Sequence, residues 1–174
     1  MTQTRQDDAA EAPAKVRVSP RLLADPGHLL ALGFGTGCAP VAPGTFGTLA
    51  GIPLFVVLQW LPLPVYAGVV ALAFVAGIWL CGRTARALGV HDHSGIVWDE
   101  VVGYLVTMTA VPVKWPWIVA GFLLFRLLDI WKPWPIRILD RRVGGGFGIM
   151  LDDLAAGIFA AIMLNVSLYI MRLQ

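Results

Sequence analysis

Charged residues are scarce in this chain of 174 residues, and residues 26–82 contain no Asp, Glu, Lys or Arg. Charged residues make up 14% of the chain and hydrophobic residues 57%, with a mean hydropathy of +0.74, whereas soluble domains average about 25% charged residues. This composition excludes a disordered chain, which needs much more charge, and a water-soluble fold, which needs polar surface in every segment. The sequence therefore predicts an integral membrane protein.

Cysteine is also rare, and the spacing of Cys38 and Cys81 fits neither a metal site nor a disulfide framework. The formal net charge of +2 is too small to indicate a nucleic-acid partner. Residues 1–28 contain no apolar run of the kind that a secretory signal peptide requires. We expect residues 1–20 to form a polar, mobile cytoplasmic tail and residues 21–174 to form a single membrane-embedded domain.

Proline and glycine divide the apolar sequence into segments that predict an all-α, polytopic helix bundle. We expect membrane-spanning helices over residues 45–61, 65–82, 95–111, 117–131 and 153–171. All five are shorter than the roughly 20 residues that cross a bilayer, so we expect four to five spans. Residues 29–42 are apolar but rich in glycine, and we expect a re-entrant or interfacial segment there.

The basic residues predict the orientation of this bundle. If the N-terminus lies inside, most of the Lys and Arg residues outside the spans fall on the same side, namely Arg5, Lys15, Arg17, Arg21, Arg83, Arg86, Lys132, Arg137, Arg141 and Arg142. Only Lys114 and Arg172 fall on the other side. Because cytoplasmic loops are enriched in Lys and Arg, we expect the N-terminus to face the cytoplasm.

Acidic residues gather at the cytoplasmic ends of the expected spans. They are Asp92, Asp99, Glu100, Asp129, Asp152 and Asp153, and the first span begins with two hydroxyl residues, Thr45 and Thr48. Ionisable residues inside spans are costly and by default mark a functional site. Clustered carboxylates favour Mg²⁺ or Mn²⁺, while Arg126 and Lys132 suit phosphate oxygens. Together these residues predict a pocket for phosphoryl transfer.

Structural interpretations of the same residues are also open. Asp152 and Asp153 could cap the last helix, and Arg126 could form an i,i+3 ion pair with Asp129. No strand is expected before the glycines at 144–148, so these predict a hinge and not a nucleotide-binding loop.

The residue types by themselves also permit a function that is not enzymatic. Carboxylates inside a membrane line ion paths as well, so a divalent-cation carrier or channel is an alternative. His91 and His93 could be metal ligands or merely solvated side chains at the interface. The gathering of acids at one face, next to cations that a carrier does not need, favours the enzyme.

Four ordered stretches carry a family resemblance. They read GFGTG through PGTFGT at 33–48, HDHSGIVWDE at 91–100, FRLLDIWKPWPIR at 125–137 and GGFGIMLDD at 145–153. In these stretches the chain resembles the phosphatidylglycerophosphatase A family, bacterial membrane phosphatases of phosphatidylglycerol synthesis. Thr48 stands where the family often has Ser, which retains the hydroxyl.

The resemblance implies removal of the terminal phosphate from phosphatidylglycerophosphate, with Mg²⁺ as cofactor, on the cytoplasmic side of the bacterial inner membrane. Asp99, Glu100, Asp129 and Asp153 would hold Mg²⁺, the first three of them catalytic, and Arg126, Lys132, Thr45, Thr48 and His93 would bind the phosphate. Attack by water and a covalent aspartyl-phosphate on Asp129 are both open. Another phospholipid as substrate is a further alternative.

Overall fold

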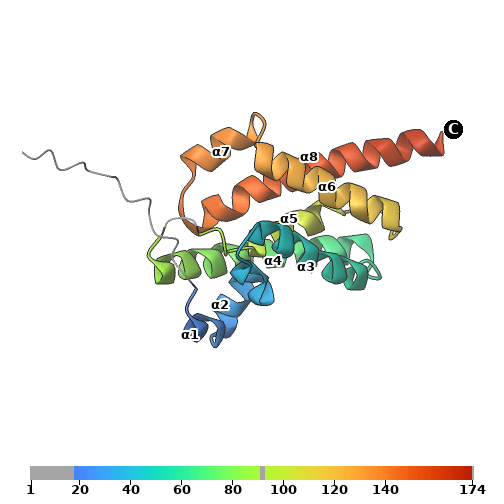
Figure 1. Ribbon diagram of the computed structural model, residues 1–174. Helices are drawn as coiled ribbons and strands as arrows, with labels where there is room; N and C mark the ends of the chain where they lie inside the picture. Colours follow the sequence, from blue (N-terminus) through green and yellow to red (C-terminus); the bar gives the residue numbers. More distant parts are fainter. Residues whose placement is uncertain (1–17, 91–92, 174) are drawn as a thin grey trace, which may run out of the picture.

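The computed structural model describes residues 18–90 and 93–173, and neither range contains a strand. The elements are α1 (Pro20–Leu23), α2 (Pro26–Ala31), the 3₁₀ helix η1 (Gly33–Cys38), α3 (Pro43–Leu58), α4 (Leu63–Leu88), α5 (Trp98–Thr107), α6 (Trp115–Trp131), α7 (Ile136–Arg142) and α8 (Gly145–Arg172). Each expected span overlaps one of the five longer helices, although only α5 lies wholly inside its expected segment. In Figure 1, α1, α2 and α7 lie toward one end of the bundle and the C-terminus lies at the other. The all-α prediction is confirmed for the described residues.

Two helices, α4 and α8, are long and apolar enough to cross a bilayer. They contain 26 and 28 residues, and their most apolar stretches have mean hydropathies of 2.1 and 2.0. At about 1.5 Å per residue, each is longer than the hydrocarbon core, which is about 30 Å thick. Only 22% and 28% of the residues in those stretches are buried, as expected for helices that contact lipid. The expectation of four to five spans remains a prediction.

Helix α5 is the shortest of the five longer helices and lies at the centre of the bundle. It contains 10 residues instead of the 17-residue segment at 95–111, because Gly95 lies in a turn and Ala110 has a left-handed backbone with φ of 61°. Tyr104 of α5 and Phe125 of α6 are fully buried, and the Tyr104 ring contacts the Phe55 ring of α3 edge to face. The core therefore surrounds α5, and α3, α6 and α8 cover it.

Helix α8 begins eight residues earlier than the sequence predicts, at Gly145 instead of Asp153. The glycines expected to form a hinge are its first turn, so the hinge prediction is wrong. A Cβ at Gly146 would overlap the carbonyl oxygen of Ile78, because α8 and α4 approach very closely there. Asp152 and Asp153 consequently lie within the helix and do not cap it.

A second close approach joins α8 to α5. A Cβ on Gly157 would lie 2.5 Å from the carbonyl oxygen of Gly103, and a Cβ on Gly103 would lie 3.0 Å from the carbonyl oxygen of Asp153. Small residues at such contacts allow two helix backbones to approach within the membrane. This crossing brings the start of α5 next to Asp153.

The segment expected to be re-entrant, residues 29–42, forms the end of α2, η1 and a loop. It is held to the rest of the fold by Asp25, whose carboxylate accepts hydrogen bonds of 2.9 and 2.8 Å from Arg83 of α4. The Arg83 guanidinium, together with the backbone N–H of His28, lowers the pKa of Asp25 to about 2. His28 is buried and lies 2.9 Å from the Thr84 hydroxyl through Nδ1. These contacts tie α2 to the end of α4.

The glycine contact between α5 and α8 generates the first prediction. Gly157→Ala should destabilise the protein by about 1–3 kcal/mol, because the added methyl group meets backbone and not a flexible side chain. Thermal unfolding in detergent measures the change. Gly68→Ala in α4 is the matched control, since a Cβ at Gly68 meets no atom within 4 Å and alanine favours the helix. Equal stability of the two variants would contradict this account of the crossing.

Candidate active site

Carboxylates from three helices meet at one place in the bundle. The five are Asp99 and Glu100 of α5, Asp129 of α6, and Asp152 and Asp153 of α8. Oxygens of Asp99, Glu100 and Asp153 lie within 4.8 Å of one another, and so do oxygens of Asp129, Asp152 and Asp153. Asp153 belongs to both groups and is only 3% exposed. We call these five residues the carboxylate cluster.

Two cationic side chains border the carboxylate cluster. Arg126 Nη1 lies 2.5 Å from Asp129 Oδ2 and 3.8 Å from Glu100 Oε1. Lys132 Nζ lies 2.5 Å from Asp152 Oδ2. The i,i+3 pair considered from the sequence is therefore present, but Arg126 also reaches a second helix. Five carboxyl groups outnumber the two cations, so ion pairs cannot neutralise all of them, and an unpaired charge is costly at a site shielded from water.

The donor atoms of the carboxylate cluster fit a hard divalent cation. All of the ligand atoms are carboxylate oxygens, which Mg²⁺ and Mn²⁺ prefer. Glu100 Oε2 is buried and has no hydrogen-bond partner among the described residues. A buried acceptor of this kind is normally satisfied, so Glu100 Oε2 is suited to coordinate an ion. Asp152 was absent from the ligands expected from sequence, although it lies within the GGFGIMLDD stretch.

The start of α3 lies against Glu100 and Arg126. A Cβ on Gly44 would overlap Glu100 Oε1 and would lie 3.1 Å from Arg126 Nη1. Thr45 is half-buried in the same first turn, whereas Thr48 is fully buried and donates its hydroxyl to the Gly44 carbonyl oxygen. The positive end of the α3 dipole therefore faces the carboxylate cluster, as is favourable for anions.

The remaining expected residues lie in two loops. His93 lies ahead of α5, and its Nδ1 accepts a 3.0 Å hydrogen bond from the Gly95 N–H. His91 and Asp92 fall outside the described residues. Lys132 ends α6 with a left-handed backbone, φ 45° and ψ 60°, a conformation that favours glycine. A long cationic side chain at a strained position suggests that the cation itself is needed there.

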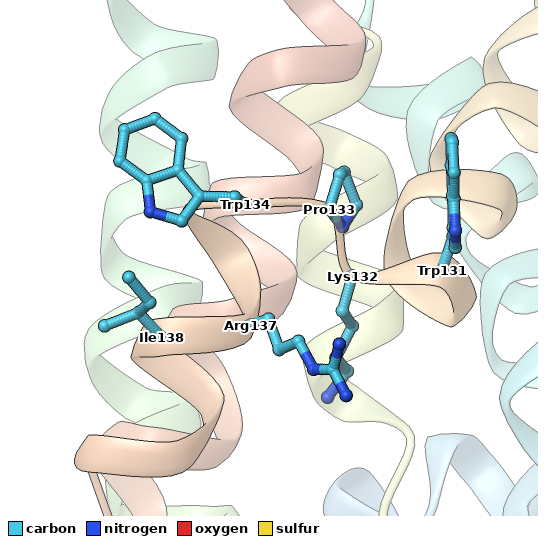
Figure 2. Close-up of a pocket in the computed structure, with 6 residues that line it drawn as sticks. All are labelled: Trp131, Lys132, Pro133, Trp134, Arg137 and Ile138. Carbon is cyan, nitrogen blue, oxygen red and sulfur yellow. The ribbon is translucent and has the colours of Figure 1, made fainter.

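A cavity of about 490 Å³ opens where α6 turns into α7. Its lining consists of Trp131, Lys132, Pro133, Trp134, Arg137 and Ile138, and we call it the α6–α7 cavity. Figure 2 shows Lys132 and Arg137 extending to one side of the connecting turn, while Trp134 and Ile138 project elsewhere. Lys132 thus lines the cavity and also pairs with the carboxylate cluster.

Comparison with known proteins establishes the family. Residues 29–168 match the model of the family described as phosphatidylglycerophosphatase A. The chain belongs to the phosphatidylglycerophosphatase A family. Phosphatidylglycerophosphatase A of Escherichia coli is 51% identical over 140 residues, which cover 80% of this chain and 81% of the relative. The Haemophilus influenzae protein of the same name is 49% identical over 143 residues, covering 81% and 88%.

A third relative extends the range of named substrates. A Bacteroides thetaiotaomicron protein that carries the provisional name phosphatidylinositol-3-phosphatase is 37% identical over 151 residues, covering 82% of this chain and 93% of the relative. No solved structure matches the chain. The part of this chain that matches the phosphatidylglycerophosphatase A family contains the whole carboxylate cluster.

The contact between α3 and Glu100 generates the second prediction. Gly44→Ala should lower the rate of phosphate release about tenfold or more, because the methyl group displaces the Glu100 carboxylate and the Arg126 guanidinium. Unfolding temperature should change little, since flexible side chains can move away. Steady-state assays beside thermal unfolding measure both effects, with Gly68→Ala again as the control. Full activity of Gly44→Ala would mean that the position of Glu100 is unimportant.

Proposed function

We propose that this protein hydrolyses the terminal phosphomonoester of phosphatidylglycerophosphate, producing phosphatidylglycerol and inorganic phosphate, and that it needs Mg²⁺. The observation that carries the proposal is the carboxylate cluster with Arg126 and Lys132 at its border, inside the part of the chain that matches the family. Buried acids beside phosphate-binding cations are the equipment that metal-assisted phosphoryl transfer requires.

Asp99, Glu100, Asp129 and Asp153 are the residues that we propose as Mg²⁺ ligands, directly or through water. Asp152 joins them as a fifth candidate, because its oxygens lie with those of Asp129 and Asp153. When bound, a divalent cation neutralises charge on the phosphate oxygens and lowers the pKa of water. The excess of carboxylates over cations supports this assignment.

The cationic side chains bind and orient the phosphate. Arg126 presents a planar fork that suits phosphate oxygens, and its pairing with Asp129 and Glu100 holds it at the border of the carboxylate cluster. Lys132 is a point charge that can exchange between Asp152 and the substrate. The backbone N–H groups in the first turn of α3, together with Thr45, add further donors for the phosphate. We assign His93 and Thr48 supporting roles in phosphate binding.

Two routes to phosphate release fit this arrangement. In the direct route, a water oxygen bonds to phosphorus while the ester P–O bond breaks. A cluster carboxylate accepts one proton of that water and returns it to the glycerol oxygen, which leaves as an alcohol. In the covalent route, an Asp129 oxygen bonds to phosphorus while the ester P–O bond breaks, and the glycerol oxygen leaves with a proton from a cluster carboxyl group. Water then attacks the phosphorus of the aspartyl-phosphate, which releases phosphate and free Asp129, and a proton of that water returns to the cluster. Trapping with hydroxylamine distinguishes the two, because hydroxylamine cleaves an aspartyl-phosphate and leaves a hydroxamate on Asp129.

We place this site at the cytoplasmic face of the bacterial inner membrane. The proposal includes four to five spans with the N-terminus inside, as the distribution of Lys and Arg favours. The start of α8, the end of α6 and the start of α5 then lie on the cytoplasmic side, which brings the carboxylate cluster to the inner leaflet. Modification of single cysteines introduced at Arg21 and Arg172 from each side of the membrane tests this orientation.

Another phospholipid is the second candidate substrate. The Bacteroides relative is named for phosphatidylinositol 3-phosphate, which like phosphatidylglycerophosphate joins a phosphodiester to a phosphomonoester through a polyol. Transport of divalent cations is disfavoured, because the described carboxylates of the cluster gather at one end of the bundle and do not cross it. Metal flux into vesicles without phosphate release would instead favour a cation carrier over a phosphatase.

The function generates the third prediction. Purified protein should release phosphate from phosphatidylglycerophosphate, and EDTA should abolish the release until Mg²⁺ is restored. Asp99→Asn and Glu100→Gln should each lower the rate about 100-fold or more, because each removes a charged oxygen ligand while retaining the shape of the side chain. Phosphate release and Mg²⁺ affinity, measured on the same preparations, check the expectation.

The exposed residue Arg21, distant in sequence from the cluster, offers a control for loss of charge. Arg21→Gln should retain the activity and Mg²⁺ affinity of the unmodified protein. Turnover that persists in EDTA would contradict the metal requirement. If the protein does not hydrolyse phosphatidylglycerophosphate but rapidly hydrolyses phosphatidylinositol 3-phosphate, the second lipid is the substrate.

A further inference from the structure

The α6–α7 cavity adjoins the carboxylate cluster but contains none of its acids. Its volume of about 490 Å³ falls within the range of small-molecule sites, roughly 300–1,000 Å³. Its charged lining is entirely basic, consisting of Lys132 and Arg137. The ligand chemistry that fits such a lining is an anion with an apolar portion.

Arg137 is the cation of this cavity that is available to a ligand. Among the side chains that the structure describes, the two other cations near the site are engaged, since Arg126 pairs with Asp129 and Lys132 pairs with Asp152. Arg137 is exposed, and no carboxylate among the side chains that the structure describes pairs with it. Its guanidinium extends to the same side of the turn as Lys132 (Figure 2). An anion bound by Arg137 would therefore lie beside the lysine that contacts the carboxylate cluster.

The aromatic lining places the cavity at the level of lipid headgroups. Trp131 and Trp134 are 73% and 79% exposed, although indole rings are usually buried in folded proteins. Exposed indole rings are typical of the membrane interface, where one edge contacts lipid and the N–H contacts polar groups. Ile130 is also exposed, on the last turn of α6. A ligand in this cavity can thus keep its acyl chains in the bilayer.

We infer that Arg137 and the α6–α7 cavity bind the phosphodiester group of the lipid whose phosphomonoester lies at the carboxylate cluster. This inference rests on the proposed function and names the feature of the substrate that the protein selects. The two phosphates of such a lipid are separated by one glycerol unit, and Lys132 lies between the two sites. Arg137 is thus a substrate-binding residue outside the reacting centre, and it favours polyol-linked lipids over lipids that carry a phosphomonoester alone.

Arg137→Gln tests this assignment. In neutral detergent micelles, the KM for phosphatidylglycerophosphate should rise about tenfold or more, because a charge-assisted hydrogen bond is lost, while kcat falls less. Arg137→Lys should recover part of the loss, since it restores the charge without the planar fork. Arg21→Gln removes an exposed charge from α1 and should leave KM unchanged.

A binding measurement makes the result independent of turnover. Short-chain phosphatidylglycerol contains the phosphodiester but no phosphomonoester, and its Kd should rise by the same factor in Arg137→Gln. If the protein releases no phosphate from any lipid while this Kd responds, the proposed function fails and the binding site stands. Unchanged KM and Kd would overturn the site. A loss that occurs only in anionic vesicles, and not in neutral micelles, would mean that Arg137 senses surface charge instead of the substrate.

Discussion

A concentration of carboxyl groups in a place shielded from water is the constraint on which the rest of this structure depends. Five carboxylates meet where three helices approach, and two cationic side chains balance part of their charge. Such an arrangement opposes folding unless something else holds the helices together. The bundle must therefore supply, through packing elsewhere, the free energy that keeps mutually repelling oxygens in place.

Glycine provides that packing at two points along α8. Gly146 contacts the backbone of α4, and Gly157 contacts the backbone of α5 at Gly103. In a bilayer, where apolar side chains gain little by leaving lipid, close backbone contact is a main source of helix association. The two contacts lie on either side of Asp152 and Asp153 in sequence, so they fix the part of α8 that carries these acids. Fold and chemistry are thus coupled through one helix.

Composition and chain breakers were sufficient for the outline of the fold. The absence of charge from residues 26–82 and the positions of proline predicted helices, and each of the five longer helices overlaps its expected segment. Boundaries were less predictable. The glycines at 144–148 predicted a hinge because no strand was expected before them. They instead form the start of α8, where contact with α4 outweighs the cost of glycine in a helix. The local sequence contains no information about this partner.

The sequence by itself determined that the chain is helical, apolar and a member of the phosphatidylglycerophosphatase A family, because composition, breakers and motif order are properties of the linear chain. Only the tertiary structure decided that Asp152 lies with Asp129 and Asp153, that Arg126 bridges α6 to α5, and that Arg137 faces a cavity. The first two depend on distances between segments far apart in sequence, and the cavity depends on how the chain turns between α6 and α7. They depend on how closely and at what rotation the helices pack, and periodicity along one helix does not encode that.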